Sequence, residues 1–106
     1  MVQLEHMLKE REEGARDFVL VDVREPNEYE INKIPGSVLI PKNEFLNGSA
    51  LERLSNDKPT VLYCKTGARS AEVLAVLKGA GFADAVHVGG GVVAWVNQID
   101  PSQPAY

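Results

Sequence analysis

A short, continuously apolar segment most constrains the fold of this chain. Residues Phe18-Val19-Leu20-Val21-Asp22-Val23 form a β-branched run with no alternation of apolar and polar positions. Strands of a parallel sheet are buried on both faces and read in this way, whereas a half-exposed strand alternates. Apolar residues at helical spacing (Val73, Leu74 and Leu77) lie further along the chain. The pattern predicts an α/β fold with an open parallel sheet of four to five strands and helices on both faces.

The other expected elements alternate along the chain. We expect strands at 18–23, 37–40, 60–63 and 85–88, helices at 2–13, 26–31, 70–80 and 92–99, and one or two helical turns within 45–54. With 106 residues and 44% hydrophobic content, the chain can bury a core without disulfide bonds. It should therefore form one domain over residues 1–100, followed by a loose C-terminal tail at 101–106 that contains Pro101 and Pro104.

Composition excludes several classes of function. The net charge of −4, from 15 acidic and 11 basic residues, argues against a nucleic-acid surface. A single cysteine excludes an internal disulfide, a C-x-x-C redox pair and a cysteine-rich zinc site, and two distant histidines add no metal cluster. We expect no metal and no cofactor. Since neither an apolar signal segment nor a stretch of transmembrane length is present, we expect a cytoplasmic protein without a membrane partner.

The one cysteine, Cys64, follows a predicted strand and precedes a predicted helix. Ligands of open α/β sheets bind at the carboxyl ends of the strands. Backbone N–H groups at a helix start lack intrahelical partners, and Lys65 and Arg69 add positive charge, so both effects favour the nucleophilic thiolate. Gly67 permits the tight turn in which loop amides converge on an anion. A small buried hydrophobe is the alternative interpretation of Cys64, but the basic loop favours a reactive thiol.

Three motifs follow one another in a fixed order. They are Asp22-Val23-Arg24-Glu25-Pro26-Asn27-Glu28-Tyr29 with Ile34-Pro35-Gly36-Ser37, then Cys64-Lys65-Thr66-Gly67-Ala68-Arg69-Ser70, then Gly81-Phe82 with Gly90-Gly91-Val92-Val93-Ala94-Trp95. Together they resemble the rhodanese family over nearly the whole chain. The resemblance implies a rhodanese-like fold and sulfurtransferase activity. In such enzymes the cysteine takes a sulfane sulfur from a donor, holds it as a persulfide and passes it to a nucleophilic acceptor.

The loop chemistry and the resemblance assign roles to the residues of the second motif. Cys64 is the expected catalytic residue, and its expected substrate-binding neighbours are Lys65, Thr66, Gly67, Ala68 and Arg69. Thr66 and Ala68 should contribute backbone N–H groups alone. Lys65 and Arg69 contact the anionic donor or the acceptor, or they are exposed loop charges; for Arg69, an ion pair with Glu72 is a further alternative.

Four residues are expected to support the loop. Asp22, Arg24 and Glu28 should form an ion-paired brace beneath it, and Ser70 should be the N-cap of the following helix. His87 is expected to be structural or exposed to solvent, and no histidine is an obvious general base. In the first motif, Asn32 and Lys33 stand where family members commonly have Gly-His.

Loop length separates sulfur transfer from phosphate chemistry. Four residues lie between Cys64 and Arg69, as in sulfur-transferring rhodaneses, whereas the related phosphatases have five. We therefore do not expect phosphatase or arsenate reductase activity.

The segment Tyr-Cys-Lys-Thr-Gly-Ala-Arg-Ser-Ala-Glu and the ending Pro-Ser-Gln-Pro-Ala-Tyr resemble one branch of the family. It is the C-terminal rhodanese domain that is fused to an E1-like adenylyltransferase in bacterial sulfur-carrier activation. The resemblance implies a ubiquitin-like sulfur-carrier protein as acceptor, an E1-like adenylyltransferase domain as partner, and a role in molybdopterin or in cysteine and thiamine biosynthesis. The donor would be thiosulfate or a cysteine desulfurase persulfide. The sequence leaves open whether this chain is a fragment of such a fusion or a stand-alone relative.

Three other functions remain open at this point. The first is a free-standing thiosulfate sulfurtransferase with cyanide or a small thiol as acceptor. The second is a non-catalytic rhodanese-like docking module. The third is a redox sensor that uses Cys64 as a sulfenic-acid switch.

Overall fold

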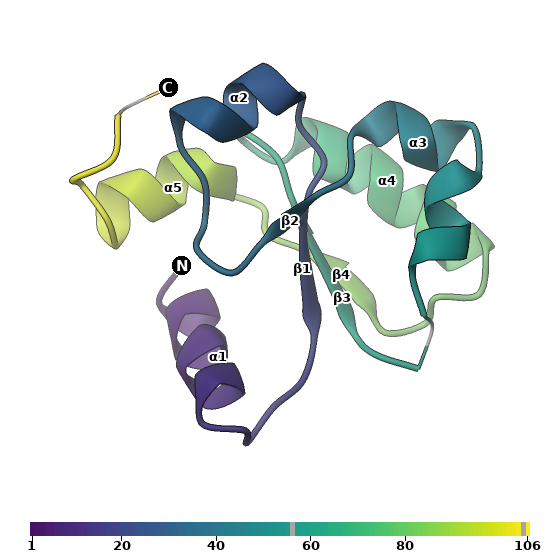
Figure 1. The fold of residues 1–106 in the computed structure, drawn as a ribbon, viewed down its shortest axis with the longest axis horizontal. Helices are drawn as coiled ribbons and strands as arrows, with labels where there is room; N and C mark the ends of the chain where they lie inside the picture. Colours follow the sequence, from purple (N-terminus) through teal and green to yellow (C-terminus); the bar gives the residue numbers. More distant parts are fainter. Residues whose placement is uncertain (56, 105) are drawn as a thin grey trace.

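The computed structural model describes residues 1–55, 57–104 and 106, and Ala105 of the predicted tail lies outside them. Its four strands form one open, fully parallel sheet in the order β2-β1-β3-β4 (Figure 1). The strands are β1 (Val19–Asp22), β2 (Val38–Leu39), β3 (Thr60–Tyr63) and β4 (Ala85–His87). The predicted α/β class and open parallel sheet are confirmed.

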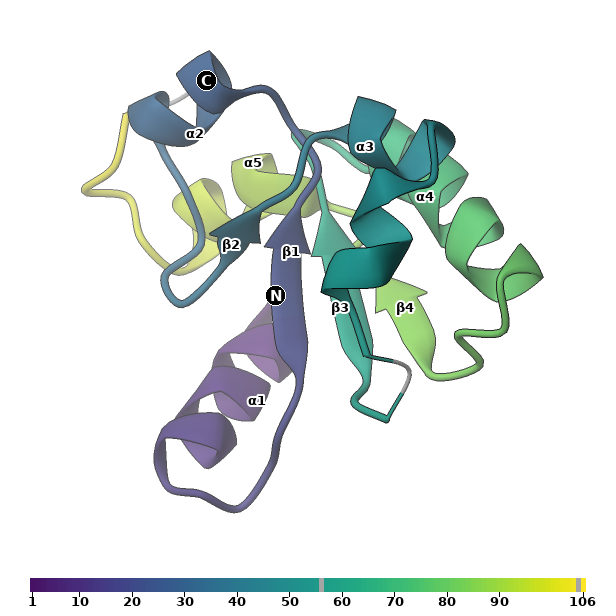
Figure 2. The same ribbon diagram turned by 45° about the vertical axis from the view of Figure 1, so that its right-hand side comes forward.

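Helices cover both faces of this sheet. They are α1 (Val2–Glu12), α2 (Pro26–Ile31), α3 (Lys42–Leu46), the 3-10 helix η1 (Ser49–Arg53), α4 (Ala68–Gly79) and α5 (Gly91–Gln98). Figures 1 and 2 show α3 and α4 on one side of the sheet and α1 and α5 on the other, while α2 lies near the end toward which the strands point. No helix among the described residues is long and apolar enough to span a bilayer.

Each face of the sheet has its own hydrophobic core. Val21 and Leu62 belong to the cluster that includes Val73 and Leu77 of α4, while the neighbouring strand residue Leu20 belongs to the opposite cluster. Successive side chains of a strand point to opposite faces. Since both faces are covered, apolar residues are favoured at successive positions of the central strands, which explains the continuous apolar run in the sequence.

Two local predictions are wrong. Helix α4 begins at Ala68 with Gly67 at the N-cap, two residues before the predicted start, so Ser70 lies inside the first turn and is not the N-cap. The predicted loose tail is fastened to the domain: Gln103 donates to Lys33 O and accepts from Lys33 N, both at 2.8 Å. Side-chain hydrogen bonds to the loop before β2 thus hold a segment that proline content alone marked as loose.

Candidate active site

Cys64 lies directly after β3, almost fully buried at 1% exposure. The backbone amides of Gly67 and Ser70 donate hydrogen bonds to its Sγ, at 3.0 and 3.4 Å, and the Ser70 hydroxyl lies 3.6 Å from the same atom. Burial by itself would raise the pKa of the thiol, but the hydrogen bonds from Ser70, Gly67 and the Thr66 amide outweigh it and lower the pKa below its ordinary value. The loop therefore favours the thiolate.

Two glycines allow the loop to pack this closely. Gly67 has a φ of +121°, and a Cβ there would lie 2.4 Å from the carbonyl oxygen of Gly89. Gly91 has a φ of +62°, and a Cβ there would lie 2.3 Å from the carbonyl oxygen of Lys65. Both positions combine a left-handed backbone with a close backbone approach, so only glycine fits without displacement.

The start of α5 holds the loop from the other side. The amide of Val92 donates to the carbonyl of Cys64 at 3.0 Å, and the amide of Val93 donates to the carbonyl of Lys65 at 3.2 Å. These are first-turn N–H groups that have no partner inside their own helix. The glycine turn before α5 therefore positions the cysteine loop, a role that we did not predict from the sequence.

Arg69 is paired with α2 rather than with its own helix. Its two terminal nitrogens donate to the two carboxylate oxygens of Glu28, at 2.7 and 2.9 Å. Hydrogen bonding to Arg69 lowers the pKa of Glu28 to about 2, and the same contact raises the pKa of Arg69. The alternative ion pair with Glu72 is wrong, because Glu72 pairs with Lys42 at 3.3 Å.

The predicted brace consists of two separate ion pairs. Beside the Glu28 pair, the fully buried guanidinium of Arg24 donates to both carboxylate oxygens of Asp22, at 2.7 to 3.0 Å. Burial opposes the charge of Arg24, yet the hydrogen bond to Asp22 raises its pKa overall. Arg24 also donates to Asn32 Oδ1 at 2.9 Å, and Asn32 Nδ2 donates to Pro104 O at 2.9 Å. Asn32 therefore links the buried Asp22–Arg24 ion pair to the C-terminal tail.

The side chains of Lys65, Thr66 and Ala68 do not contact the Cys64 thiol. Lys65 is partly exposed, with Nζ 4.1 Å from the ring centre of Tyr106, and Thr66 and Ala68 are exposed. Tyr106 also donates to Glu28 Oε2 at 3.2 Å. The described part of the tail therefore lies beside the basic loop.

His87 approaches the site from β4. Its Nδ1 lies 3.0 Å from the Ser70 hydroxyl, which in turn lies 3.6 Å from Cys64 Sγ. We did not assign this histidine to the site from the sequence. The available signal was its position at the carboxyl end of a strand paired with β3, because such ends meet at one edge of a parallel sheet.

Comparison with known proteins identifies the family of this fold. The Rhodanese-like domain family matches residues 3–98. The chain belongs to this family. Over 94 residues it is 50% identical to "Probable adenylyltransferase/sulfurtransferase MoeZ" of Mycobacterium tuberculosis (strain CDC 1551 / Oshkosh), covering 89% of this chain and 24% of that protein. The chain thus spans about a quarter of that relative.

Two further matches cover most of this chain and most of the matched protein. "Thiosulfate sulfurtransferase GlpE" of Pseudomonas syringae pv. syringae (strain B728a) is 40% identical, covering 80% of this chain and 76% of that protein. The crystal structure of a rhodanese-like domain protein from Staphylococcus aureus superimposes with a TM-score of 0.72 at 30% identity, covering 93% of this chain and 91% of that chain. The predicted family is confirmed, and sulfur transfer is the general chemistry that these rhodanese-like relatives support.

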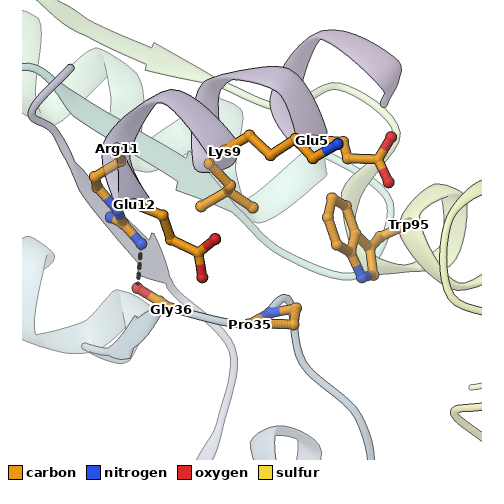
Figure 3. A pocket seen from close by; sticks show the side chains of 8 residues that line it. Glu5, Lys9, Arg11, Glu12, Pro35, Gly36 and Trp95 are labelled. Atoms are coloured by element: carbon orange, nitrogen blue, oxygen red, sulfur yellow. Dashed lines mark hydrogen bonds between the residues drawn. The ribbon is translucent and has the colours of Figure 1, made fainter. Parts of the chain in front are cut away.

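A separate pocket of about 300 Å³ lies in this rhodanese-like domain between α1, the Pro35-Gly36 turn and Trp95 (Figure 3). Arg11 closes one end of it by donating to Gly36 O at 3.0 Å. None of the predicted site residues lines the pocket. Among the described residues, no group of three His, Cys, Asp or Glu side chains could hold a metal ion.

Proposed function

We propose that this domain is a sulfurtransferase that carries sulfane sulfur as a Cys64 persulfide. The observation that carries the proposal is the convergence of the Gly67 and Ser70 amides and the Ser70 hydroxyl on a buried Sγ, at 3.0 to 3.6 Å. Preorganised donors of this kind stabilise the thiolate before attack and an anionic persulfide after it. We expect the donor to bind at the residues that follow Cys64 in the loop, which are Lys65, Thr66, Gly67, Ala68 and Arg69.

The transfer proceeds in two displacement steps. The Cys64 thiolate attacks the outer sulfur of thiosulfate; a new S–S bond forms, the S–S bond of thiosulfate breaks, and sulfite leaves with the electron pair. With a cysteine desulfurase persulfide as donor, the leaving group is the donor thiolate. A nucleophilic acceptor then attacks the terminal sulfur, and Cys64 leaves as the thiolate. No net oxidation or reduction by a third reagent is needed.

We further propose a ubiquitin-like sulfur-carrier protein as the acceptor, activated by an E1-like adenylyltransferase domain. The support is the 50% identity to a protein whose name couples the adenylyltransferase and sulfurtransferase activities. A second candidate acceptor is cyanide or a small thiol, as for a free-standing thiosulfate sulfurtransferase. The 40% identity to such an enzyme over most of its length favours this candidate.

Intact mass spectrometry tests the proposal directly. The protein is incubated briefly with thiosulfate, then divided and treated with cyanide or buffer, alongside Cys64→Ala. We expect a gain of one sulfur atom that cyanide removes and that the variant never acquires. If neither thiosulfate nor a desulfurase persulfide adds sulfur to the folded protein, the proposal is wrong, and docking or redox sensing becomes the better account.

A second assay distinguishes the two acceptors. Persulfide-loaded protein is mixed with cyanide or with an adenylated ubiquitin-like carrier protein, and the loss of sulfur is followed by mass. Faster discharge to the carrier supports the protein acceptor. Faster discharge to cyanide supports the small-molecule acceptor.

A further inference from the structure

One buried hydroxyl links the thiol to the histidine. Ser70 Oγ, fully buried, lies 3.6 Å from Cys64 Sγ, 3.1 Å from Gly67 O and 3.0 Å from His87 Nδ1. A hydroxyl has a single proton to donate and two lone pairs with which to accept. It cannot donate to all three neighbours at once, so Gly67 O, Cys64 Sγ and His87 Nδ1 compete for its proton.

The two protonation states of Cys64 allow opposite directions of hydrogen bonding between the thiol, Ser70 and His87. When the thiol is protonated, S–H donates to Ser70 Oγ and the hydroxyl donates onward to His87 Nδ1. When the thiolate is present, the hydroxyl donates to Sγ and accepts from an Nδ1–H of the imidazole. The two arrangements are related by moving the thiol proton to Ser70 while the hydroxyl proton moves to His87. Imidazole is suited to this because its nitrogens both accept and donate.

His87 also connects this chain of groups to solvent. Cys64 and Ser70 are buried, whereas His87 is partly exposed, so its imidazole is the member of the chain that solvent reaches.

We propose that His87 is a positioning residue for Cys64. The His87 imidazole receives the thiol proton by way of the Ser70 hydroxyl. It then donates a hydrogen bond to Ser70 Oγ, and the Ser70 hydroxyl donates a hydrogen bond to the thiolate. This inference rests on the proposed function of Cys64 as the sulfur nucleophile. One S–H bond breaks and one N–H bond forms, with no change in oxidation state.

Other charged groups face the Cys64 end of this relay. On the Cys64 side they are Arg69, which interacts electrostatically with the thiolate, its partner Glu28, and Lys65. On the His87 side, no hydrogen bond or ion pair among the described residues joins the imidazole to a charged group. None of the charged groups near Cys64 bonds to the Ser70 hydroxyl, so substitutions at Ser70 and His87 separate the relay from these charges.

The pH dependence of Cys64 alkylation by iodoacetamide tests the proposal without any sulfur donor. The variants are Ser70→Ala, His87→Gln and the double variant, with His6→Gln as the matched control because His6 is an exposed histidine of α1. We expect each single variant to move the alkylation midpoint up by about one pH unit, the tenfold equivalent of one hydrogen bond to the thiolate. The double variant should move it no further, since both changes break one chain. His6→Gln should leave it unchanged.

Two results overturn the proposal. The first is an alkylation midpoint in His87→Gln equal to that of the unsubstituted protein. The second is that His87→Gln shifts the alkylation midpoint as much in the Ser70→Ala background as it does alone. A second measurement keeps both side chains in place. The nitrogen NMR shifts of the His87 ring are followed against pH in the unsubstituted protein and in Cys64→Ala. Linkage requires the ring midpoint to move when the thiol is removed; an unchanged midpoint refutes the relay even if a Ser70 variant fails to fold. Failure to load sulfur would refute the proposed function and leave these alkylation results intact.

Discussion

Replacing Glu28 by glutamine should destabilise the fold in a pH-dependent way. Hydrogen bonding to Arg69 lowers the pKa of Glu28 from 4.5 to about 2. The difference of about 2.5 units, at ~1.36 kcal/mol per unit, corresponds to ~3 kcal/mol of stability near neutral pH. Because the Arg69 side chain is 30% exposed, solvent screening reduces this, and we expect a loss of about 2 kcal/mol.

The direction follows from the order of the two pKa values. The folded-state pKa of Glu28 lies below the unfolded value, so the unfolded chain binds more protons between about pH 2 and 4.5. The stabilisation is therefore complete above pH 4.5 and is lost as the pH falls toward 2. The difference between the unsubstituted protein and Glu28→Gln should shrink over the same range.

Urea unfolding at pH 7, 4.5, 3.5 and 2.5 measures this difference. Glu30→Gln is the matched control, since Glu30 is an exposed residue of the same helix. It should unfold like the unsubstituted protein at every pH. A Glu28→Gln difference that stays constant with pH would show that the loss comes from packing and not from the ion pair with Arg69. A difference below about 0.5 kcal/mol at pH 7 would refute the reasoning altogether.

Four further substitutions test the framework around the site. Gly91→Ala should cost more than about 2 kcal/mol in chemical unfolding, because it adds a Cβ against backbone at a positive φ; Gly79→Ala, in helix α4 with nothing within 4 Å, should instead stabilise by about 0.5–1 kcal/mol. Arg24→Met should cost about 3–5 kcal/mol by thermal melting, since it leaves a buried carboxylate unpaired. Asn32→Ala should increase amide exchange and proteolysis near Pro104, with a loss of about 1 kcal/mol in overall stability.

The sequence was sufficient to predict the fold because its signals are local. The apolar run at 18–23 and the helical spacing of Val73 and Leu77 each report burial within one element, and alternation of such elements implies a parallel sheet. The errors lie at boundaries. Helix α4 starts at Ala68 because Gly67 takes a positive φ before it, and neither polarity nor periodicity encodes that conformation.

The candidate site was only partly predictable because its contacts join distant segments. The position of Cys64 after a strand and before a helix was visible in the sequence, and the structure places the loop amides around its sulfur. The pairing of Arg69 with Glu28, 41 residues away, was not visible, since helical spacing offered the nearer Glu72. The contact from His87 likewise depends on the order of strands in the sheet, which periodicity does not determine.

The groups that stabilise negative charge on Cys64 are not the basic side chains that the loop composition indicates. Lys65 and Arg69 make the loop basic in sequence, yet Arg69 is held by Glu28 and Lys65 lies over the ring of Tyr106. The groups that donate to the Cys64 sulfur are instead the amides of Gly67 and Ser70, with the Ser70 hydroxyl beside them. Backbone dipoles are fixed by the fold and need no reorganisation when negative charge develops on the sulfur. The reactivity of the thiol therefore depends on every contact that shapes the loop, which makes Gly91 and His87 part of its chemistry although both lie outside the cysteine motif.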